Sequence, residues 1–207
     1  MTGITPALGD DVAELTEIAC KKAKEKGVTI SCDLNYRNKL WSKAKAREVM
    51  TKLMQYVDVC ISNEEDAKDV FGIEAEGTDI TGGKLNKAGY ESVAKQLKDT
   101  FNFKYVAITL RTSISANDNK WAGMLYDGKA YFSKEYLMHI VDRVGGGDSF
   151  GGGLIYALLQ NYDPQSAIEF AVAASCLKHS IEGDFNMMSV DEVKKLAGGD
   201  ASGRVQR

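Results

Sequence analysis

The run Val57-Asp58-Val59-Cys60-Ile61-Ser62 has the apolar and β-branched character of a strand that is covered on both faces. The runs Val28–Cys32 and Phe103–Thr109 are of the same kind. Each of the three follows a segment whose apolar residues recur at helical spacing, over residues 10–26, 43–56 and 87–99. Helices that alternate with buried strands in this way predict an α/β fold with a mainly parallel sheet between layers of helices.

The second half of the chain adds a hairpin and further helices. The pair Asp127-Gly128 is a strong signal for a two-residue turn between strands near residues 120–126 and 129–133. Residues 74–84 hold three glycines and few large apolar residues, which predicts a surface loop. Helices are expected over residues 148–161 and 164–179, and a last one from near Ser189. The sequence shows no internal repeat or linker, so we expect a single domain over residues 1–207.

Two of the expected helices have an apolar face. The helix over residues 10–26 places Val12, Leu15, Ile18 and Ala19 on one side, at the spacing typical of a packed face. The helix over residues 43–56 is expected to turn its apolar side inward, with Val49, Leu53 and Met54 in the core.

Composition narrows the class of protein. The chain has 207 residues, 44% hydrophobic and 27% charged, which is typical of a globular protein rather than a disordered one. A net charge of -3 gives no reason to expect nucleic acid or an anionic membrane as a partner. The chain lacks both the run of about 20 apolar residues that a membrane span needs and a recognisable secretion signal. The four cysteines have no metal-like spacing, so buried, reduced thiols in a cytoplasmic protein are expected.

Residues 145–153 read Gly-Gly-Gly-Asp-Ser-Phe-Gly-Gly-Gly and lead into an apolar helix. The first amides of a helix lack intrahelical partners, and without side chains in the way those of Gly145, Gly146 and Gly147 can converge on an anion. A phosphoryl group in transfer suits such a hole, and the carboxylate of Asp148 could take the proton of the attacking hydroxyl. The alternative is that Asp148 is a helix N-cap and that the glycines allow close packing.

The run Asp142-Arg143-Val144-Gly145-Gly146-Gly147-Asp148 resembles the signature D-[TS]-x-G-A-G-D of the ribokinase/PfkB family of carbohydrate kinases. Arg143 departs from the Thr or Ser of the pattern, and Gly146 departs from its Ala. The departure at Arg143 could perturb the monovalent-cation site that some members build around this segment, so the sequence does not decide whether such a site is used. The resemblance implies a ribokinase-like α/β/α fold, with Asp148 as the catalytic base and Gly145–Gly147 as the anion hole.

Three further segments are similar to 2-dehydro-3-deoxygluconate kinases within this family: residues 2–8, 33–41 and 177–186. That enzyme class uses ATP to phosphorylate the 6-hydroxyl of a six-carbon keto-acid. The resemblance implies ATP and Mg²⁺ as cofactors and a sugar acid as substrate. Arg37 could hold the carboxylate of that substrate, or the transferring phosphate, through two parallel hydrogen bonds. A surface salt bridge is the alternative role for Arg37.

The resemblance also implies nucleotide contacts. Asn63-Glu64-Glu65-Asp66 is similar to the family's N-x-x-E segment, which orders water and Mg²⁺ near the phosphates, so Glu64 and Asp66 are candidate metal residues acting through water. An N-cap with acids in the first turn explains the same residues and is compatible with that role. The resemblance implies that the remaining candidates contact the nucleotide: Asn63, Thr109 and Arg111 beside its phosphates, with Ala174 and Cys176 on the wall of the adenine site. A solvated side chain is the alternative for Arg111, and ordinary helix packing is the favoured alternative for Ala174 and Cys176. His139 and His179 receive no catalytic role.

Family members are longer, and their N-terminal part carries most sugar contacts and a lid. We therefore expect this chain to be the nucleotide-binding and catalytic portion of an N-terminally truncated kinase, without those strands and that lid. A homo-oligomer is possible for the intact protein. Two other functions stay open: a kinase for a neutral sugar such as fructose or ribose, and a nucleotide-binding fragment with little turnover.

Overall fold

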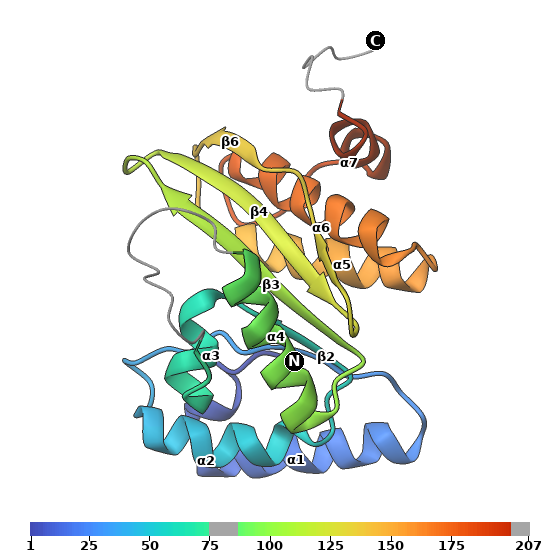
Figure 1. The fold of residues 1–207 in the computed structure, drawn as a ribbon. Coiled ribbons are helices and arrows are strands. Elements are labelled where there is room, and N and C mark those ends of the chain that lie inside the picture. Colours follow the sequence, from blue (N-terminus) through green and yellow to red (C-terminus); the bar gives the residue numbers. More distant parts are fainter. Residues whose placement is uncertain (75–86, 200–207) are drawn as a thin grey trace. The chain divides into compact units, whose positions relative to one another are not determined.

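The computed structural model describes residues 1–74 and 87–199, in two compact units (Figure 1). The first unit comprises residues 1–110 with 125–130, and the second comprises residues 111–124 with the chain from Tyr131 onward. The loop predicted over residues 74–84 falls almost wholly on residues 75–86, outside the described residues. That the chain forms a single domain stays a prediction.

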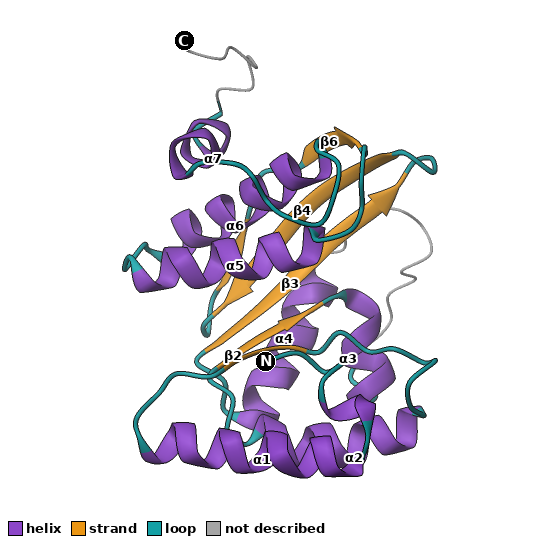
Figure 2. Cartoon of the chain, turned by 180° about the vertical axis from the view of Figure 1, so that it is seen from behind, coloured by secondary structure: helices purple, strands orange, loops and turns teal. Residues whose placement is uncertain are grey.

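The first unit is built on parallel strands that alternate with helices. Its elements are a 3₁₀ turn (Pro6–Leu8), α1 (Asp10–Glu25), β1 (Ser31–Asp33), α2 (Lys43–Met54), β2 (Val59–Ser62), α3 (Glu64–Phe71), α4 (Lys87–Phe101) and β3 (Tyr105–Ser113). The strand β3 continues past Leu110 into the second unit. The strands β1, β2 and β3 pair in parallel, so that Cys32 lies opposite Cys60 and Cys60 lies opposite Val106. Residues Val28 to Ile30 were expected in the first strand, which instead begins at Ser31. The predicted alternation of helix and parallel strand is confirmed (Figure 2).

The two helices with apolar faces behave differently. Val49, Leu53 and Met54 of α2 are buried as predicted. The prediction that α1 packs through Val12, Leu15, Ile18 and Ala19 is wrong, because Leu15 and Ile18 are 64% and 48% exposed. The buried side of α1 holds Thr16 and Cys20 instead. Thr16 can be buried at little cost because its hydroxyl donates to the Val12 carbonyl at 2.7 Å.

The second unit contains the strands and helices of the C-terminal half. Its elements are β4 (Asp118–Tyr126), β5 (Ala130–Phe132), β6 (Tyr136–His139), α5 (Gly146–Leu159), α6 (Pro164–His179) and α7 (Val190–Ala197), of which β4 and β5 also extend into the first unit. The sheet order is β1-β2-β3-β4-β5, and β6 pairs with β4 in antiparallel register. The predicted hairpin at Asp127-Gly128 forms, with residues 127–129 as its connection. The strand β6 was not predicted.

Close packing of α6 fixes the position of α5 within the second unit. A methyl group on Gly153 of α5 would lie 3.1 Å from the Ala171 Cα and from the Ala174 Cβ of α6. The two helices accordingly lie side by side in both views (Figures 1 and 2). Gly123 of β4 likewise faces α6, since an added methyl would meet the Val172 side chain at 2.8 Å. Glycine at these places lets helix and strand approach closely.

The four cysteines are buried and free, as expected from their spacing. None of the helices in the described parts of the chain is both long and apolar enough to span a bilayer.

Candidate active site

The three glycines at the start of α5 have three different environments. Gly145 has φ +80°, and an added Cβ would lie 2.1 Å from the Asp184 carbonyl oxygen. A Cβ on Gly146 would lie 2.3 Å from Cε1 of the His179 ring. A Cβ on Gly147 would meet nothing within 4 Å. Packing therefore explains the first two glycines, whereas Gly147 borders open space.

Part of the first turn of α5 has unused hydrogen-bond donors. The amides of Gly146 and Ser149 donate to backbone carbonyls at 3.3 and 2.8 Å. The amides of Gly145, Gly147 and Asp148 have no acceptor among residues 1–74 and 87–199. These donors lie at the positive end of the helix dipole, which favours an anion there.

Asp148 is the acidic residue of this first turn, and its side chain is exposed. The N-cap of α5 is Gly145, so the alternative in which Asp148 itself caps the helix is wrong. Within the described residues the Asp148 carboxylate makes no hydrogen bond or ion pair, and it is exposed beside the unused amides.

Helix α6 holds the first turn of α5 in place. The Ser175 hydroxyl donates to the Gly146 carbonyl at 2.8 Å. The His179 ring lies against Gly146, and its Nδ1 is 2.7 Å from the Ser175 carbonyl oxygen. Burial, followed by nearby cationic groups including Lys178, lowers the pKa of His179. The ring is therefore neutral near pH 7, with Nδ1–H as the donor. Sequence reasoning gave His179 no catalytic role, and the signal for this supporting role was only the i, i+4 spacing from Ser175.

The segment before α5 is tied to the turn that follows α6. The Asp142 carboxylate accepts from the amide of Val144 at 3.0 Å and from that of Gly183 at 2.9 Å. These two hydrogen bonds, together with the charge of Lys178, lower the pKa of Asp142. Arg143, which departs from the family pattern, turns its guanidinium to the Ala116 carbonyl.

The expected nucleotide contacts have different environments. Thr109 is half-buried on β3, and Arg111 is exposed. Ala174 packs its Cβ against Gly153, and its carbonyl accepts from the Asn186 side chain at 3.2 Å.

Cys176 is 8% exposed, and burial raises the pKa of its thiol to about 12. It is therefore an inert, protonated thiol at neutral pH.

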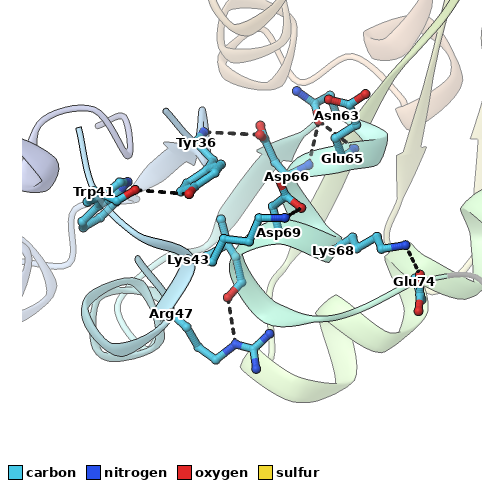
Figure 3. A network of polar contacts seen from close by, with 11 residues as sticks. Tyr36, Trp41, Lys43, Arg47, Asn63, Glu65, Asp66, Lys68, Asp69 and Glu74 are labelled. Carbon is cyan, nitrogen blue, oxygen red and sulfur yellow. Dashed lines mark hydrogen bonds and ion pairs between the residues drawn. The ribbon is translucent and has the colours of Figure 1, made fainter. Parts of the chain in front are cut away.

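In the first unit, Asn63 caps α3 with its own side chain (Figure 3). Its Oδ1 accepts from the amides of Glu65 at 2.9 Å and of Asp66 at 2.8 Å. The predicted N-cap is confirmed, and it occupies the donors that an anion would otherwise use. The side chain of Glu64 lies outside the described part of the structure.

Asp66 reaches from α3 to the turn that follows β1. Its Oδ1 accepts from the Tyr36 amide at 3.3 Å, and the residue is 6% exposed (Figure 3). Burial first, and then the negative charge of Asp33, raise the pKa of Asp66 to about 7. A divalent cation nearby would offset the repulsion between the two carboxylates.

Arg37 is carried by the same turn. Its side chain is exposed, and Nη1 donates to the neighbouring Tyr36 carbonyl at 3.0 Å. Among the described residues no ion pair includes Arg37, so the alternative of a surface salt bridge is not observed there. The guanidinium is available to an acidic ligand.

The first unit thus gathers Arg37, Asn63 and Asp66, and the second gathers the glycine turn, Asp148 and the α6 residues. The free amides at α5 fit phosphate oxygens. Within the described ranges no group of three or more His, Cys, Asp or Glu side chains could hold a metal. Mg²⁺ would therefore need nucleotide phosphates and waters as further ligands, which is its usual coordination.

A family model, described as pfkB family carbohydrate kinase, matches residues 2–189. A 2-dehydro-3-deoxygalactonokinase from Haloferax volcanii is 31% identical over 201 residues, which are 97% of this chain and 57% of that protein. A 2-dehydro-3-deoxygluconokinase from Thermoproteus tenax is 26% identical over 185 residues, 88% of this chain and 49% of that protein. The chain thus spans about half the length of these relatives.

Among solved structures, the 2-dehydro-3-deoxygluconokinase from Thermotoga maritima superimposes with a TM-score of 0.90 at 52% identity. The match covers 96% of this chain and 58% of that one. The expected ribokinase-like α/β fold is therefore confirmed, because the chain shares the fold of this solved carbohydrate kinase.

Proposed function

We propose that this chain, which belongs to the pfkB family of carbohydrate kinases, is the ATP-binding and catalytic portion of a sugar-acid kinase. The reaction proposed is transfer of the γ-phosphoryl group of ATP to the 6-hydroxyl of 2-dehydro-3-deoxygluconate. The observation that carries the proposal is the first turn of α5, where unpaired amides and the exposed carboxylate of Asp148 lie together. Names of similar proteins support the class of substrate.

The proposed mechanism uses few protein groups. Asp148 accepts the proton of the 6-hydroxyl as its oxygen attacks the γ-phosphorus, the bond to the β-phosphate oxygen breaks, and ADP leaves. The free amides of Gly145 and Gly147 stabilise the charge that builds on the transferring phosphoryl oxygens. Ser175 and His179 keep the turn in position for this role.

Further contacts are proposed for the remaining candidates. Arg37 holds the substrate carboxylate, while Glu64 and Asp66 order waters around Mg²⁺. Asn63, Thr109 and Arg111 lie beside the phosphates, with Ala174 and Cys176 behind the adenine. The burial of Ala174 and Cys176 favours packing as their main role and limits them to the wall of such a site.

The test of the base is Asp148→Asn in the 207-residue chain. We expect ATP binding by calorimetry to persist and turnover in a coupled ADP assay to fall by about 10²–10⁴. Asp191→Asn is the matched control, because Asp191 is also an exposed acid in the first turn of a helix. If the unchanged chain turns over and both variants retain its rate, Asp148 is rejected as the base.

A neutral-sugar kinase is distinguished by its response to the substrate carboxylate. If Arg37 holds that group, Arg37→Met raises KM for 2-dehydro-3-deoxygluconate while leaving rates on fructose and ribose unchanged. Higher kcat/KM for a neutral sugar in the unchanged chain would favour the alternative.

A nucleotide-binding fragment with little turnover is the third possibility. The observation that favours it is the span of the chain, 57% and 58% of the lengths of two similar proteins. Sugar and ATP must both be held for the positioning effect to operate, and this effect is worth about 7–11 kcal/mol at best. ATP binding without turnover in the assays above would favour this function, and clear turnover would reject it.

A further inference from the structure

Lys178, near the end of α6, has a fully buried side chain. Lysine is almost never fully buried unless its ammonium group is paired, because removing an unpaired charge from water is costly. The Nζ atom donates to the Ile181 carbonyl at 3.3 Å. A single carbonyl does not compensate a buried cation, so the partner that balances its charge must be sought nearby.

Asp142 lies in the segment before α5, and its pKa is lowered by two amide hydrogen bonds first and to a lesser extent by the charge of Lys178. Among the described residues no ion pair within 4.0 Å joins the two side chains, so the direct contact of the ammonium is the Ile181 carbonyl in the turn after α6. The carboxylate connects two pieces of chain, the segment before α5 through Val144 and the turn after α6 through Gly183.

The same two pieces of chain meet again at Gly145. An added Cβ on that glycine would lie 2.1 Å from the Asp184 carbonyl oxygen, so the backbones are in close contact there. Gly145 is the N-cap of α5, and its left-handed conformation sets the direction of the first free amides. A shift of the turn after α6 would therefore move these amides.

We infer that Lys178 is a positioning residue, whose buried ammonium holds the turn after α6 through the Ile181 carbonyl and thereby fixes the anion-binding turn at the start of α5. The inference rests on the proposed function for its catalytic consequence. The ammonium also adds fixed positive charge behind a turn that is proposed to receive phosphate. A role in packing alone would need only the aliphatic stem of Lys178, and the two roles can be separated by experiment.

The test compares Lys178→Met, which keeps the stem and removes the charge, with Lys178→Ala. Lys194→Met is the control, because Lys194 is exposed on α7. The measurements on the 207-residue chain are the Asp142 pKa by carboxyl NMR, hydrogen exchange at the Val144 and Gly183 amides, and Mg·ATP affinity by calorimetry. For Lys178→Met we expect a higher Asp142 pKa, faster exchange at both amides and affinity lower by about tenfold.

Chemical rescue separates charge from volume. Propylammonium has the three carbons and the nitrogen that Lys178→Ala removes, so it should restore slow exchange at Val144 and Gly183, whereas 1-propanol, an alcohol of the same size, should not. Equal rescue by the alcohol would overturn the inference. So would a Lys178→Met chain whose Asp142 pKa and amide exchange match the unchanged protein, and this result decides the question if Lys178→Ala does not fold.

Failure of the proposed function gives a different pattern. If the unchanged chain binds no Mg·ATP, the kinase proposal fails, while the NMR titration and amide exchange still report on Lys178. If ATP binds and Lys178→Met alters neither affinity nor exchange, only the role of Lys178 fails.

Discussion

The starts of α3 and α5 are two helix N-termini with acidic residues in the first turn, and they use their amides in opposite ways. At α3 the Asn63 side chain accepts from two of the first amides, so the helix is closed by its own sequence. At α5 the cap is Gly145, which has no side chain to offer, and three amides keep free donors within the described chain. A closed start stabilises a fold, whereas an open one leaves binding capacity for an anion.

The aspartates in the first turns of α3 and α5 also differ in their exposure to solvent. Asp66 is 6% exposed and has a raised pKa, while Asp148 is exposed to solvent. Asp66 therefore belongs to the interior of its unit, and Asp148 can meet a reactant. The difference supports the proposal that the chemistry takes place at the start of α5, with α3 as a support whose proposed contact with Mg²⁺ is through water.

The largest effect is expected at Asp66, through pH. Its pKa of about 7 lies above the ordinary aspartate value of 3.8, so the folded state holds a proton that the unfolded state has released between these values. Stability should therefore fall as pH rises from about 4 to 7 and remain low above 7. Asp66→Asn removes this loss and should stabilise the protein at pH 8 by up to about 4 kcal/mol.

Urea unfolding at pH 4, 6 and 8 measures this effect. Glu65→Gln is the control, because Glu65 is the exposed neighbour in the same turn. If the free energy of unfolding changes with pH in the same way in Asp66→Asn and in the unchanged chain, the pKa of Asp66 is not raised by burial.

The next effect is expected at Gly146, where the open turn depends on tight packing. An added methyl would lie 2.3 Å from a His179 ring that is held by Ser175 and packs near Trp121, with ring centroids 5.3 Å apart. Gly146→Ala should therefore lower the free energy of unfolding by about 1–3 kcal/mol. Gly152→Ala on the same helix meets nothing within 4 Å and serves as the control. Equal stability of the two variants in urea would contradict the packing argument.

A smaller effect is expected at the closed turn. Asn63→Ala removes the acceptor of two amides and should cost about 1 kcal/mol, whereas Asn63→Asp keeps the cap. If Asn63 also donates to a nucleotide phosphate, Asn63→Asp weakens Mg·ATP binding at unchanged stability, which calorimetry and thermal unfolding together can measure. Unchanged affinity in Asn63→Asp would leave Asn63 with the cap alone.

Most elements of the fold could be predicted because buried strands and amphipathic helices repeat at periods that the sequence displays. The strand β6 was missed because Tyr136–His139 is too short to show a period. The prediction of an apolar packed face on α1 was wrong because the Thr16 hydroxyl is hydrogen-bonded to a carbonyl of its own helix. A polar residue can therefore face inward while Leu15 faces the solvent. A hydrogen bond of this kind within the helix cannot be predicted from the spacing of apolar residues alone.

The site was predictable only in part. The glycine run marked the start of α5, and Asn63 marked the start of α3. Burial of Lys178 could not be predicted, because it depends on how the turn after α6 folds back so that the Ile181 carbonyl accepts from the ammonium. Sequence reasoning also treated the three glycines alike, although Gly145 and Gly146 lie against other parts of the chain and Gly147 borders open space.

Gly147 is the glycine for which neither packing nor backbone strain gives a reason, and it carries the smallest expected effect on stability. Gly147→Ala places a methyl in open space within a helix, so it should stabilise the protein by about 0.5–1 kcal/mol, as Gly152→Ala should. If the open space is where phosphate oxygens approach, Gly147→Ala alone should weaken Mg·ATP binding. Thermal unfolding and calorimetry on this pair decide the matter, because equal affinity in both variants would remove Gly147 from the anion hole. If Gly147→Ala is more stable than the unchanged chain but binds Mg·ATP more weakly, then glycine at this position lowers stability and favours binding of the nucleotide at the open turn.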